Sequence, residues 1–307
     1  MATSIILLTI GFVLLIRGAD KFVDSAVQIA HRFHIPPIII GTTLVAIGTS
    51  APEATISIIA ALRGATGVSI GNVLGSNITN IFLILGLTAI IGRPIIQNNT
   101  KKYELPFMGI ITLLVCFIGL WFGEISRTSA LVFLILFVAF IVYNIITARK
   151  AKNTPENITT VPWHQVIVMI FAGIAAIVIG GDLIVDSATN IALRFGVSER
   201  VIGLTLVALG TSLPELVVSV TAAIKHQYDM AVGNVVGSNI FNILFVLGLA
   251  AFIRPMPFAQ EFISDGAIAM LAVIILMIFT AKNARLNRGA GITFVTAYLA
   301  YIAYLIA

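Results

Sequence analysis

The sequence predicts an all-α integral membrane protein with about ten transmembrane helices, arranged as two inverted five-helix repeats. Hydrophobic residues make up 59% of the 307 residues and charged residues only 10%, whereas soluble domains carry roughly 25% charged residues. Apolar runs of about 17–25 residues recur along the chain, and each is long enough to cross a hydrocarbon core of about 30 Å. Such long, uniformly apolar runs favour helices over the alternating strands of a barrel.

The second observation behind this fold class is an internal repeat at an offset of 162 residues. Gly41–Glu53 (GTTLVAIGTSAPE) aligns without a gap on Gly203–Glu215 (GLTLVALGTSLPE), and Gly71–Ile81 aligns on Gly233–Ile243. About half of the positions between residues 41 and 91 are identical in the two copies. Chance similarity of apolar helices would not preserve the shared Gly, Ser, Thr, Asn and Glu positions, so we interpret the copies as one duplicated structural unit.

Each copy divides into five predicted spans. The spans lie near residues 3–30, 36–63, 67–91, 103–122 and 126–148 in the first copy, and near 163–193, 198–224, 229–254, 259–280 and 289–306 in the second. An odd number of spans per copy places the copies in opposite orientations. The predicted organisation is a first repeat over 1–148, a cytoplasmic linker over 149–162 and a second repeat over 163–307.

The loops predict how the chain lies in the membrane. With the N-terminus outside, the cytoplasmic loops carry 11 Lys and Arg residues and the opposite loops carry five, which places both termini on the extracytoplasmic side. The formal charge of +5 then reflects orientation rather than nucleic-acid binding. The segment Met1–Ile16 lacks a basic n-region and a cleavage site, so we expect a first span rather than a signal peptide. The absence of a transit peptide favours a prokaryotic inner membrane.

Two glutamates carry the functional argument. Glu53 and Glu215 occupy equivalent positions within otherwise apolar spans. An ionisable group at the middle of a membrane costs several kcal/mol, so it is a functional hypothesis by default. No Lys or Arg lies near either residue in its own span or in the predicted spans 67–91 and 229–254. A divalent cation, several monovalent cations or protons must therefore balance the two charges.

The residues around each glutamate favour a metal cation. Each glutamate follows a threonine by four residues, so we expect hydroxyl and carboxylate to share a helical face. Each also directly follows a proline, which predicts a break that frees backbone carbonyl oxygens for cations. These positions are Thr49, Pro52 and Ala46–Gly48 in the first copy, and Thr211, Pro214 and Ala208–Gly210 in the second.

Further oxygen atoms come from the next span of each copy. A row of amides and hydroxyls at four-residue spacing consists of Asn72, Ser76 and Asn80, repeated as Asn234, Ser238 and Asn242. Oxygen ligands without nitrogen or sulfur are what Ca²⁺ and Na⁺ prefer. By spacing, Ser50 and Ser212 point away from the glutamate face and rank behind these residues. The Gly71-x-x-x-Gly75 spacing, repeated at Gly233 and Gly237, predicts close helix packing rather than ligands.

On its paired GTSxPE segments (Gly48–Glu53, Gly210–Glu215) and GNVxGSNIxN segments (Gly71–Asn80, Gly233–Asn242), the sequence resembles the sodium/calcium exchanger family of the cation/calcium antiporter superfamily. The resemblance covers essentially the whole chain. It implies antiport of one Ca²⁺ against several Na⁺, with the first helix of each repeat sliding to alternate access. It assigns Ca²⁺ to Glu53, Glu215, Thr49 and Thr211, and Na⁺ additionally to Ser76, Ser238 and the carbonyls of Ala46 and Ala208, with Asn80 and Asn242 lining the centre.

Ca²⁺ and Na⁺ are thus expected as transported substrates, without a prosthetic group, and membrane lipid as the surroundings. We expect no enzymatic activity, no nucleic-acid partner and no protein partner, consistent with a monomer. Ca²⁺/H⁺ exchange at the same glutamates stays open, as does K⁺ coupling, although K⁺-dependent relatives typically carry Asp at the position of Asn242. An intramembrane hydrolase would need Asp-centred signatures or a Ser/His pair, and a zinc protease an H-E-x-x-H helix; neither is present. A purely structural protein would not need duplicated glutamates.

Residues outside these motifs receive simpler interpretations. Asp20, Asp24, Asp182 and Asp186 lie toward span ends, where solvation or ion pairing is expected. Cys116 lies in an apolar run and is expected to be an inert thiol. The four histidines fall in loops and give no zinc pattern.

Overall fold

The computed structural model describes residues 2–150, 161–195, 208–282 and 285–306. Most of the predicted linker and the first part of the predicted span 198–224 fall outside the described residues. In the first copy the elements are α1 (Ala2–Arg32), α2 (Pro37–Ile40), η1 (Gly41–Val45), α3 (Ala46–Thr49), α4 (Ala51–Arg63), α5 (Thr66–Thr79), η2 (Asn80–Leu85), α6 (Gly86–Gly92), η3 (Thr100–Glu104), α7 (Leu105–Phe122), β1 (Glu124–Ile125) and α8 (Arg127–Lys150). The second copy contains α9 (Trp163–Arg194), α11 (Ala208–Thr211), α12 (Leu213–Ile224), α13 (Tyr228–Phe241), η5 (Asn242–Leu247), α14 (Gly248–Ile253), β2 (Met256–Pro257), α15 (Glu261–Lys282) and α16 (Arg288–Ile306).

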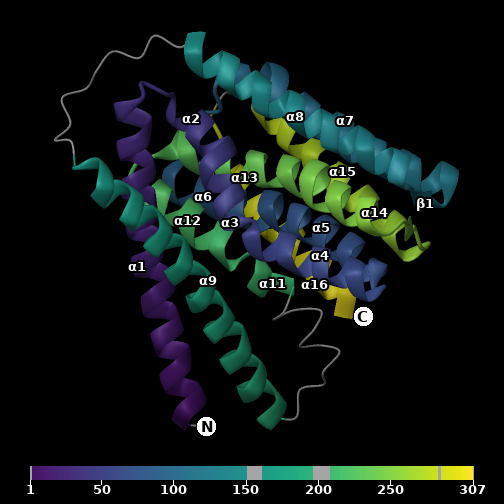
Figure 1. Cartoon of the computed structure of the whole chain (residues 1–307), viewed down its shortest axis with the longest axis horizontal. Coiled ribbons are helices and arrows are strands. Elements are labelled where there is room, and N and C mark those ends of the chain that lie inside the picture. The colour runs from purple at the N-terminus through teal and green to yellow at the C-terminus, as the bar shows by residue number, and fades with distance from the viewer. Residues whose placement is uncertain (1, 151–160, 196–207, 283–284, 307) are drawn as a thin grey trace.

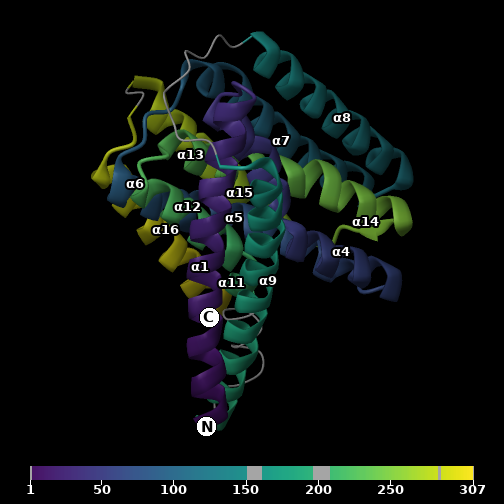
Figure 2. The ribbon, with the colours of Figure 1, turned by 60° about the vertical axis from the view of Figure 1, so that its left-hand side comes forward.

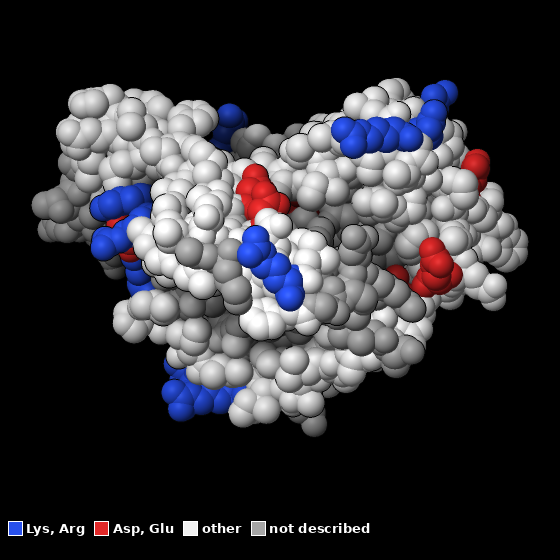
Figure 3. Space-filling view, turned by 90° about the horizontal axis from the view of Figure 1, so that it is seen from below, with Lys and Arg blue, Asp and Glu red and all other residues white. Residues whose placement is uncertain are grey.

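The described helices confirm a helical membrane protein and support the predicted span count in part. Six are long and apolar enough to cross a membrane by length and composition, and the bent pair Pro37–Thr49 and Ala51–Arg63 would make a seventh. Apolar side chains cover the outer helices: Trp121 of α7 is 75% exposed and Ile135 of α8 is 66% exposed. Figure 3 shows wide uncharged surface between a few scattered charged side chains on one face. Such a surface suits lipid as the surrounding solvent.

The helix that carries each glutamate is broken, as the prolines predict. The break falls at Ser50, with φ −84° and ψ 13°, and at the equivalent Ser212, with φ −88° and ψ 6°. The first-copy helix bends by 48° there. Pro52 and Pro214 lie in the first turn of the following helices, where a missing N–H is tolerated, and their rings prevent the preceding helix from continuing.

Two long helices, α1 and α9, pack mainly on each other. Figures 1 and 2 both show α1 and α9 side by side along most of their length, whereas α7 and α8 lie along the opposite edge in Figure 1. Glycines allow α1 and α9 to approach closely. A Cβ atom on Gly18 would lie 2.9 Å from the carbonyl oxygen of Gly173, and one on Gly180 would lie 2.7 Å from the backbone nitrogen of Leu15. Small residues of this kind bring helix backbones together inside membranes.

Helix α13 forms the centre of the molecule, since every residue from Met230 to Phe241 is buried. It packs against α2 and η1 from the first copy and α12 from the second. The close contact depends on the predicted glycine pair of the second copy, because a Cβ atom on Gly233 would lie 2.5 Å from the carbonyl oxygen of Ile38. The prediction is wrong for the first copy, where a Cβ atom on Gly75 would meet nothing within 4 Å. A two-residue antiparallel pairing of β1 with β2 joins the α7–α8 turn to the segment before α15.

We expect Gly237→Ala to lower the thermal unfolding midpoint of the detergent-solubilised protein, because its Cβ atom would lie 2.5 Å from the Cα atom of Thr42. Because a backbone atom cannot rotate away as a side chain can, the added methyl group should destabilise the folded protein by about 1–3 kcal/mol. Gly109→Ala is the matched control, since its Cβ atom would come no closer than 3.4 Å to Val273. Equal midpoints for the two variants would contradict the close packing of α13 on η1.

Candidate functional site

Glu53 and Glu215 meet in the interior, each immediately after the break in its helix. Both side chains are fully buried, at 0% exposure, and the two carboxylates interact electrostatically. Glu53 lies in the first turn of α4 and Glu215 in the first turn of α12. A helix N-terminus carries partial positive charge, so each helix stabilises the anion that it holds. The breaks therefore bring the two buried carboxyl groups together, each beside a helix N-terminus.

The two serines at the breaks bond to the glutamate of the other copy. The Ser50 hydroxyl donates to Oε1 of Glu215 at 2.6 Å, and the Ser212 hydroxyl donates to Oε1 of Glu53 at 3.4 Å. The prediction that Ser50 and Ser212 point away from the glutamates is wrong for two reasons. Regular helical spacing does not continue through a break, and the relevant carboxylate comes from the other copy. A search for contacts between repeats, rather than within one, would have found them.

Thr49 also reaches across the two copies. Its hydroxyl donates to Oδ1 of Asn234 at 3.1 Å and to the backbone oxygen of Ala46 at 3.3 Å, and it interacts with the Glu215 carboxylate. The spacing argument associates Thr49 with Glu53 on one continuous helix, and the break at Ser50 removes that basis. Thr211 lies at the end of α11 and takes part in an interaction of its own.

A pair of asparagines fixes the helices that bear the glutamates. Asn72 Nδ2 donates to the backbone oxygen of Glu53 at 3.2 Å and to the Ser57 hydroxyl at 3.0 Å. Asn234 Nδ2 donates in the same way to the backbone oxygen of Glu215 at 3.5 Å and to the hydroxyl of Ser219 at 2.9 Å. These contacts tie α5 to α4 and α13 to α12, so both asparagines position the glutamates through their backbone.

Four further asparagines form a closed cluster between α5 and α13. Asn80 Nδ2 donates to Oδ1 of Asn239 at 2.9 Å, and Asn242 Nδ2 donates to Oδ1 of Asn77 at 3.3 Å. Asn77 and Asn239 donate to each other's backbone oxygens at 3.3 and 3.4 Å. The cluster consumes the amide N–H groups of Asn80 and Asn242, and it leaves their oxygens without a partner.

Five buried oxygens around the glutamates have no hydrogen-bond partner. They are Oε2 of Glu53, Oε2 of Glu215, Oδ1 of Asn80, Oδ1 of Asn242 and the Ser238 hydroxyl. Ser76 and Ser238 lie beside the carboxylates of Glu53 and Glu215, respectively. Buried polar atoms normally have a partner, and each exception calls for an explanation.

The backbone carbonyls at the break are only partly free. The Ala46 oxygen accepts hydrogen bonds from the Ser50 backbone N–H at 3.0 Å and from the Thr49 hydroxyl. The Gly48 oxygen lies four residues before Pro52, whose nitrogen has no hydrogen to donate to it. For Ala208, the structure describes the backbone at the start of α11.

The atoms around the glutamates that lack a hydrogen-bond partner are all oxygens. Across the described residues, no ion pair reaches either glutamate, and no group of three His, Cys, Asp or Glu side chains is present that could hold a metal ion. Two carboxylates surrounded by hydroxyls and amide oxygens are suited to hard cations such as Ca²⁺ and Na⁺.

The aspartates near the span ends form ion pairs in one copy. Lys225, which follows α12, contacts Asp20 Oδ1 at 2.6 Å and Asp24 Oδ1 at 2.5 Å. This confirms ion pairing, with a partner from the other copy. The equivalent Asp182 and Asp186 on α9 are exposed and make no ion pair with any described residue.

Comparison with known proteins places the chain in a family. The model of the family described as "Sodium/calcium exchanger protein" matches residues 3–146 and 165–307. The putative antiporter CaxA of Alkalimonas amylolytica is 38% identical over 98% of both chains. The sodium/calcium exchanger MaX1 of Methanosarcina acetivorans is 32% identical over 99% of both.

A solved structure of the sodium-calcium exchanger NCX_Mj, soaked with Na⁺ and Sr²⁺, superposes with a TM-score of 0.87 at 35% identity, covering 98% of this chain and 97% of that one. These matches extend over nearly the whole chain and agree with the repeat motifs and the helical membrane fold. The chain belongs to the sodium/calcium exchanger family of the cation/calcium antiporter superfamily, a family of transporters rather than enzymes.

Proposed function

We propose that this protein exchanges Ca²⁺ for Na⁺ across the membrane, and that both ions compete for one site at Glu53 and Glu215. The observation that carries the proposal is a pair of fully buried carboxylates, each with one oxygen lacking a partner. Leaving two such anions without a counter-charge in a low dielectric is very unfavourable. A bound cation supplies the charge, and the oxygen-rich surroundings supply the coordination.

The proposed ligands follow from the distribution of oxygens. Ca²⁺ is bound by Glu53 and Glu215 with the hydroxyls of Thr49 and Thr211. Na⁺ additionally uses Ser76, Ser238 and the carbonyls of Ala46 and Ala208, while the oxygens of Asn80 and Asn242 face the centre. The unpartnered atoms of Ser238, Asn80 and Asn242 support their roles. The Ala46 carbonyl already accepts two hydrogen bonds, so coordination there requires one of them to be exchanged.

Coupling arises from competition for the same charge. One Ca²⁺ or a set of Na⁺ ions neutralises the two carboxylates, and neither class of ion fits while the other is bound. An empty, doubly ionised site is disfavoured, so the protein changes its access state with ions bound. Ser50 and Ser212 orient one oxygen of each carboxylate and leave the other for the cation.

Access alternates, in this proposal, between two sides of a ten-helix bundle. Residues 1–148 and 163–307 form the two inverted five-helix repeats, joined by the cytoplasmic linker 149–162. Helices α1 and α9 slide together past the rest of the bundle, supported by their close packing on each other and their separation from the outer helices. Both termini lie outside the cytoplasm of a prokaryotic inner membrane, and one chain suffices for transport.

We expect Glu53→Gln and Glu215→Gln each to abolish Ca²⁺ uptake into Na⁺-loaded proteoliposomes diluted into Na⁺-free buffer at fixed pH. Each change removes one of two charges that face the cation, and loss of one partner of a buried charge interaction costs about 3–5 kcal/mol, more than about 100-fold in affinity. Glu124→Gln is the control, because Glu124 is exposed on β1 and far from the break.

Radioactive Ca²⁺ uptake measures the outcome. Ca²⁺ uptake that does not depend on Na⁺ but is driven by an imposed pH gradient would indicate Ca²⁺/H⁺ exchange at the same glutamates. A requirement for K⁺ would indicate K⁺ coupling. The neutral amide of Asn242, which donates to Asn77, disfavours that alternative. Unchanged uptake in both glutamine variants would contradict the site itself.

Ser50→Ala should weaken Ca²⁺ uptake more than Ser212→Ala does. The Ser50 hydroxyl approaches its carboxylate to 2.6 Å, whereas the Ser212 hydroxyl lies 3.4 Å from its own. A hydrogen bond to a charged group contributes about 1.5–3 kcal/mol, so Ser50→Ala should raise the Ca²⁺ concentration for half-maximal uptake about tenfold. Ser50→Thr keeps the hydroxyl and should restore most of the affinity. A Ser50→Ala variant with wild-type Ca²⁺ dependence would exclude this positioning role.

A further inference from the structure

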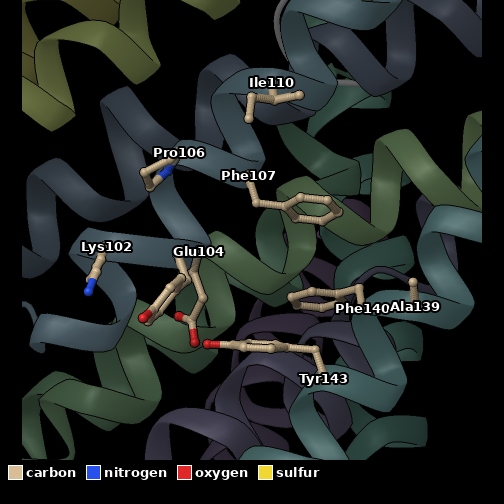
Figure 4. A pocket seen from close by; sticks show the side chains of 9 residues that line it. Lys102, Glu104, Pro106, Phe107, Ile110, Ala139, Phe140 and Tyr143 are labelled. Atoms are coloured by element: carbon tan, nitrogen blue, oxygen red, sulfur yellow. The ribbon is translucent and has the colours of Figure 1, made fainter.

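We propose that a groove between α7 and α8 is a binding site for phosphatidylethanolamine, with the lipid ammonium group on Glu104. The cavity has a volume of about 420 Å³ and lies where η3 and the start of α7 face α8. Figure 4 shows the Glu104 carboxylate and the Tyr143 hydroxyl pointing toward each other at one end, and Phe107 and Phe140 along the groove. Glu104 lies outside the glutamate site proposed for ion exchange.

Glu104 is a buried acid without a basic partner. Its side chain is 4% exposed, and its Oε2 atom has no hydrogen-bond partner. The hydroxyl of Thr100, one turn earlier, is also buried and lies beside the carboxylate. Neither Lys101 nor Lys102 forms an ion pair with it in the described structure. Oε2 therefore keeps a free acceptor position, which a ligand carrying a donor or a cation can fill.

The depth of the groove matches a lipid headgroup. Glu104 lies one turn inside the span that begins at Thr100, and Lys101 and Lys102 mark its polar end. On α8, Ile135 and Val138 are 66% and 61% exposed, as expected for a helix that faces acyl chains. An amphiphile from the bilayer therefore reaches the groove without crossing the protein.

The lining of the groove matches both ends of such a lipid. The rings of Tyr103 and Tyr143 lie 6.4 Å apart in the lining. Lys102 Nζ lies over the Tyr103 ring at 5.3 Å, so the Tyr143 ring is the one open to a ligand ammonium group. The stacked rings of Phe107 and Phe140, 5.9 Å apart, offer an apolar floor to an acyl chain. Lys102, at the mouth, provides a charge for the phosphate. A primary ammonium donates hydrogen bonds to Glu104, which the trimethylammonium of phosphatidylcholine cannot do.

Native mass spectrometry of the full chain, released from a mixture of phosphatidylethanolamine, phosphatidylcholine and phosphatidylglycerol, tests the proposal. The wild-type protein should retain phosphatidylethanolamine in preference to both other lipids. Glu104→Gln should reduce that preference about tenfold, as expected for losing a charge-assisted hydrogen bond. Lys102→Gln should weaken retention of all three lipids alike, because all share the phosphate. Glu124→Gln serves as the control for a general change in charge.

Two results would overturn this site. One is equal retention of phosphatidylethanolamine and phosphatidylcholine by the wild-type protein, a comparison that needs no variant to fold. The other is an unchanged preference in folded Glu104→Gln, which would mean that the acid carries a proton and meets no ammonium.

A second observation independently suggests a conformational latch, an inference that rests on the alternating access proposed above. Lys225 holds α1 to the end of α12 through Asp20 Oδ1, the backbone oxygen of Asp20 at 3.1 Å, and Asp24 Oδ1. Burial lowers the pKa of Lys225, but its hydrogen bonds to Asp20 and Asp24 raise the pKa above the ordinary value, so the latch is charged at neutral pH. Three contacts to one ammonium exceed the single contact of an ordinary surface pair.

The repeat contains the same three residues a second time. At the offset of 162, Asp20, Asp24 and Lys225 correspond to Asp182, Asp186 and Arg63. Arg63 ends α4 as Lys225 follows α12, yet Arg63, Asp182 and Asp186 are exposed and make no ion pair with any described residue. One latch is closed and its repeat-related counterpart is open.

An inverted repeat explains why one set of aspartates is paired and the other is not. Because the repeats are inverted, a contact that one repeat makes on one side of the bundle has a counterpart from the other repeat on the opposite side, and alternating access moves one bundle against the other. We infer that Lys225 releases α1 in that state and that Arg63 captures Asp182 and Asp186 on α9. Because α1 and α9 pack along each other, they move together, and the two latches alternate.

Disulfide cross-linking tests whether Arg63 of α4 approaches Asp186 of α9. In a Cys116→Ser background, the pair Arg63→Cys and Asp186→Cys should form a disulfide under oxidation, detected by peptide mass spectrometry. Adding Lys225→Gln should raise its yield about two- to fivefold, the effect expected from losing one surface ion-pair network. Glu124→Gln is the matched control, because it removes one exposed charge on β1 and belongs to neither latch.

Two results would overturn the latch. One is a disulfide yield for Arg63→Cys with Asp186→Cys that does not change when Lys225→Gln is added. The other is failure of that pair to form a disulfide under conditions in which the pair Asp24→Cys and Lys225→Cys does form one. The cross-linking does not require transport. Failure of the proposed exchange would appear separately, as absence of Na⁺-dependent Ca²⁺ uptake from the unsubstituted chain.

Discussion

Repulsion between two buried carboxylates is the constraint on which the rest of this structure depends. Glu53 and Glu215 lie fully buried and close enough to interact. An apolar bundle would expel or neutralise such a pair, so every nearby feature that favours the charged form has a physical purpose. The first turns of α4 and α12 contribute helix dipoles, and the serine hydroxyls contribute hydrogen bonds. One oxygen of each carboxylate, Oε2, is left without a hydrogen-bond partner.

The breaks at Ser50 and Ser212 have two consequences: each creates a helix N-terminus in the interior, and each releases a serine from helical geometry. A continuous helix would place its N-terminus at the membrane surface, more than a turn away from the glutamate. Stopping the helix before Pro52 and starting another creates a helix N-terminus in the interior, directly beside the charge. The same break releases the serine from helical geometry, so that its side chain reaches across to the carboxylate of the other copy. Proline, serine and glutamate are thus one functional unit rather than three separate motifs.

The sequence could predict this arrangement up to the point where the two copies meet. Apolar length, the repeat and Pro52 predicted the broken helices, and the isolated position of Glu53 in an apolar span singled out a carboxylate that the structure buries. The contact of Ser50 with Glu215 could not be predicted from spacing, because spacing describes one continuous helix and this contact joins two. The roles of Asn72 and Asn234 were missed for the same reason: their amides bond to backbone oxygens of a neighbouring helix. Lys225 as the partner of Asp20 likewise depends on tertiary packing.

The two copies have nearly the same motifs but are not in the same conformation. The serine-to-glutamate bond is 2.6 Å in one direction and 3.4 Å in the other, and the aspartates of α1 are paired while those of α9 are not. The sequence differences at these positions are small: the serines, glutamates and aspartates are identical, and Arg replaces Lys. Such a difference therefore belongs to the conformation and not to the residues. In the exchange mechanism proposed above, the contacts that one half makes in this conformation are those that the other half makes in the opposite access state.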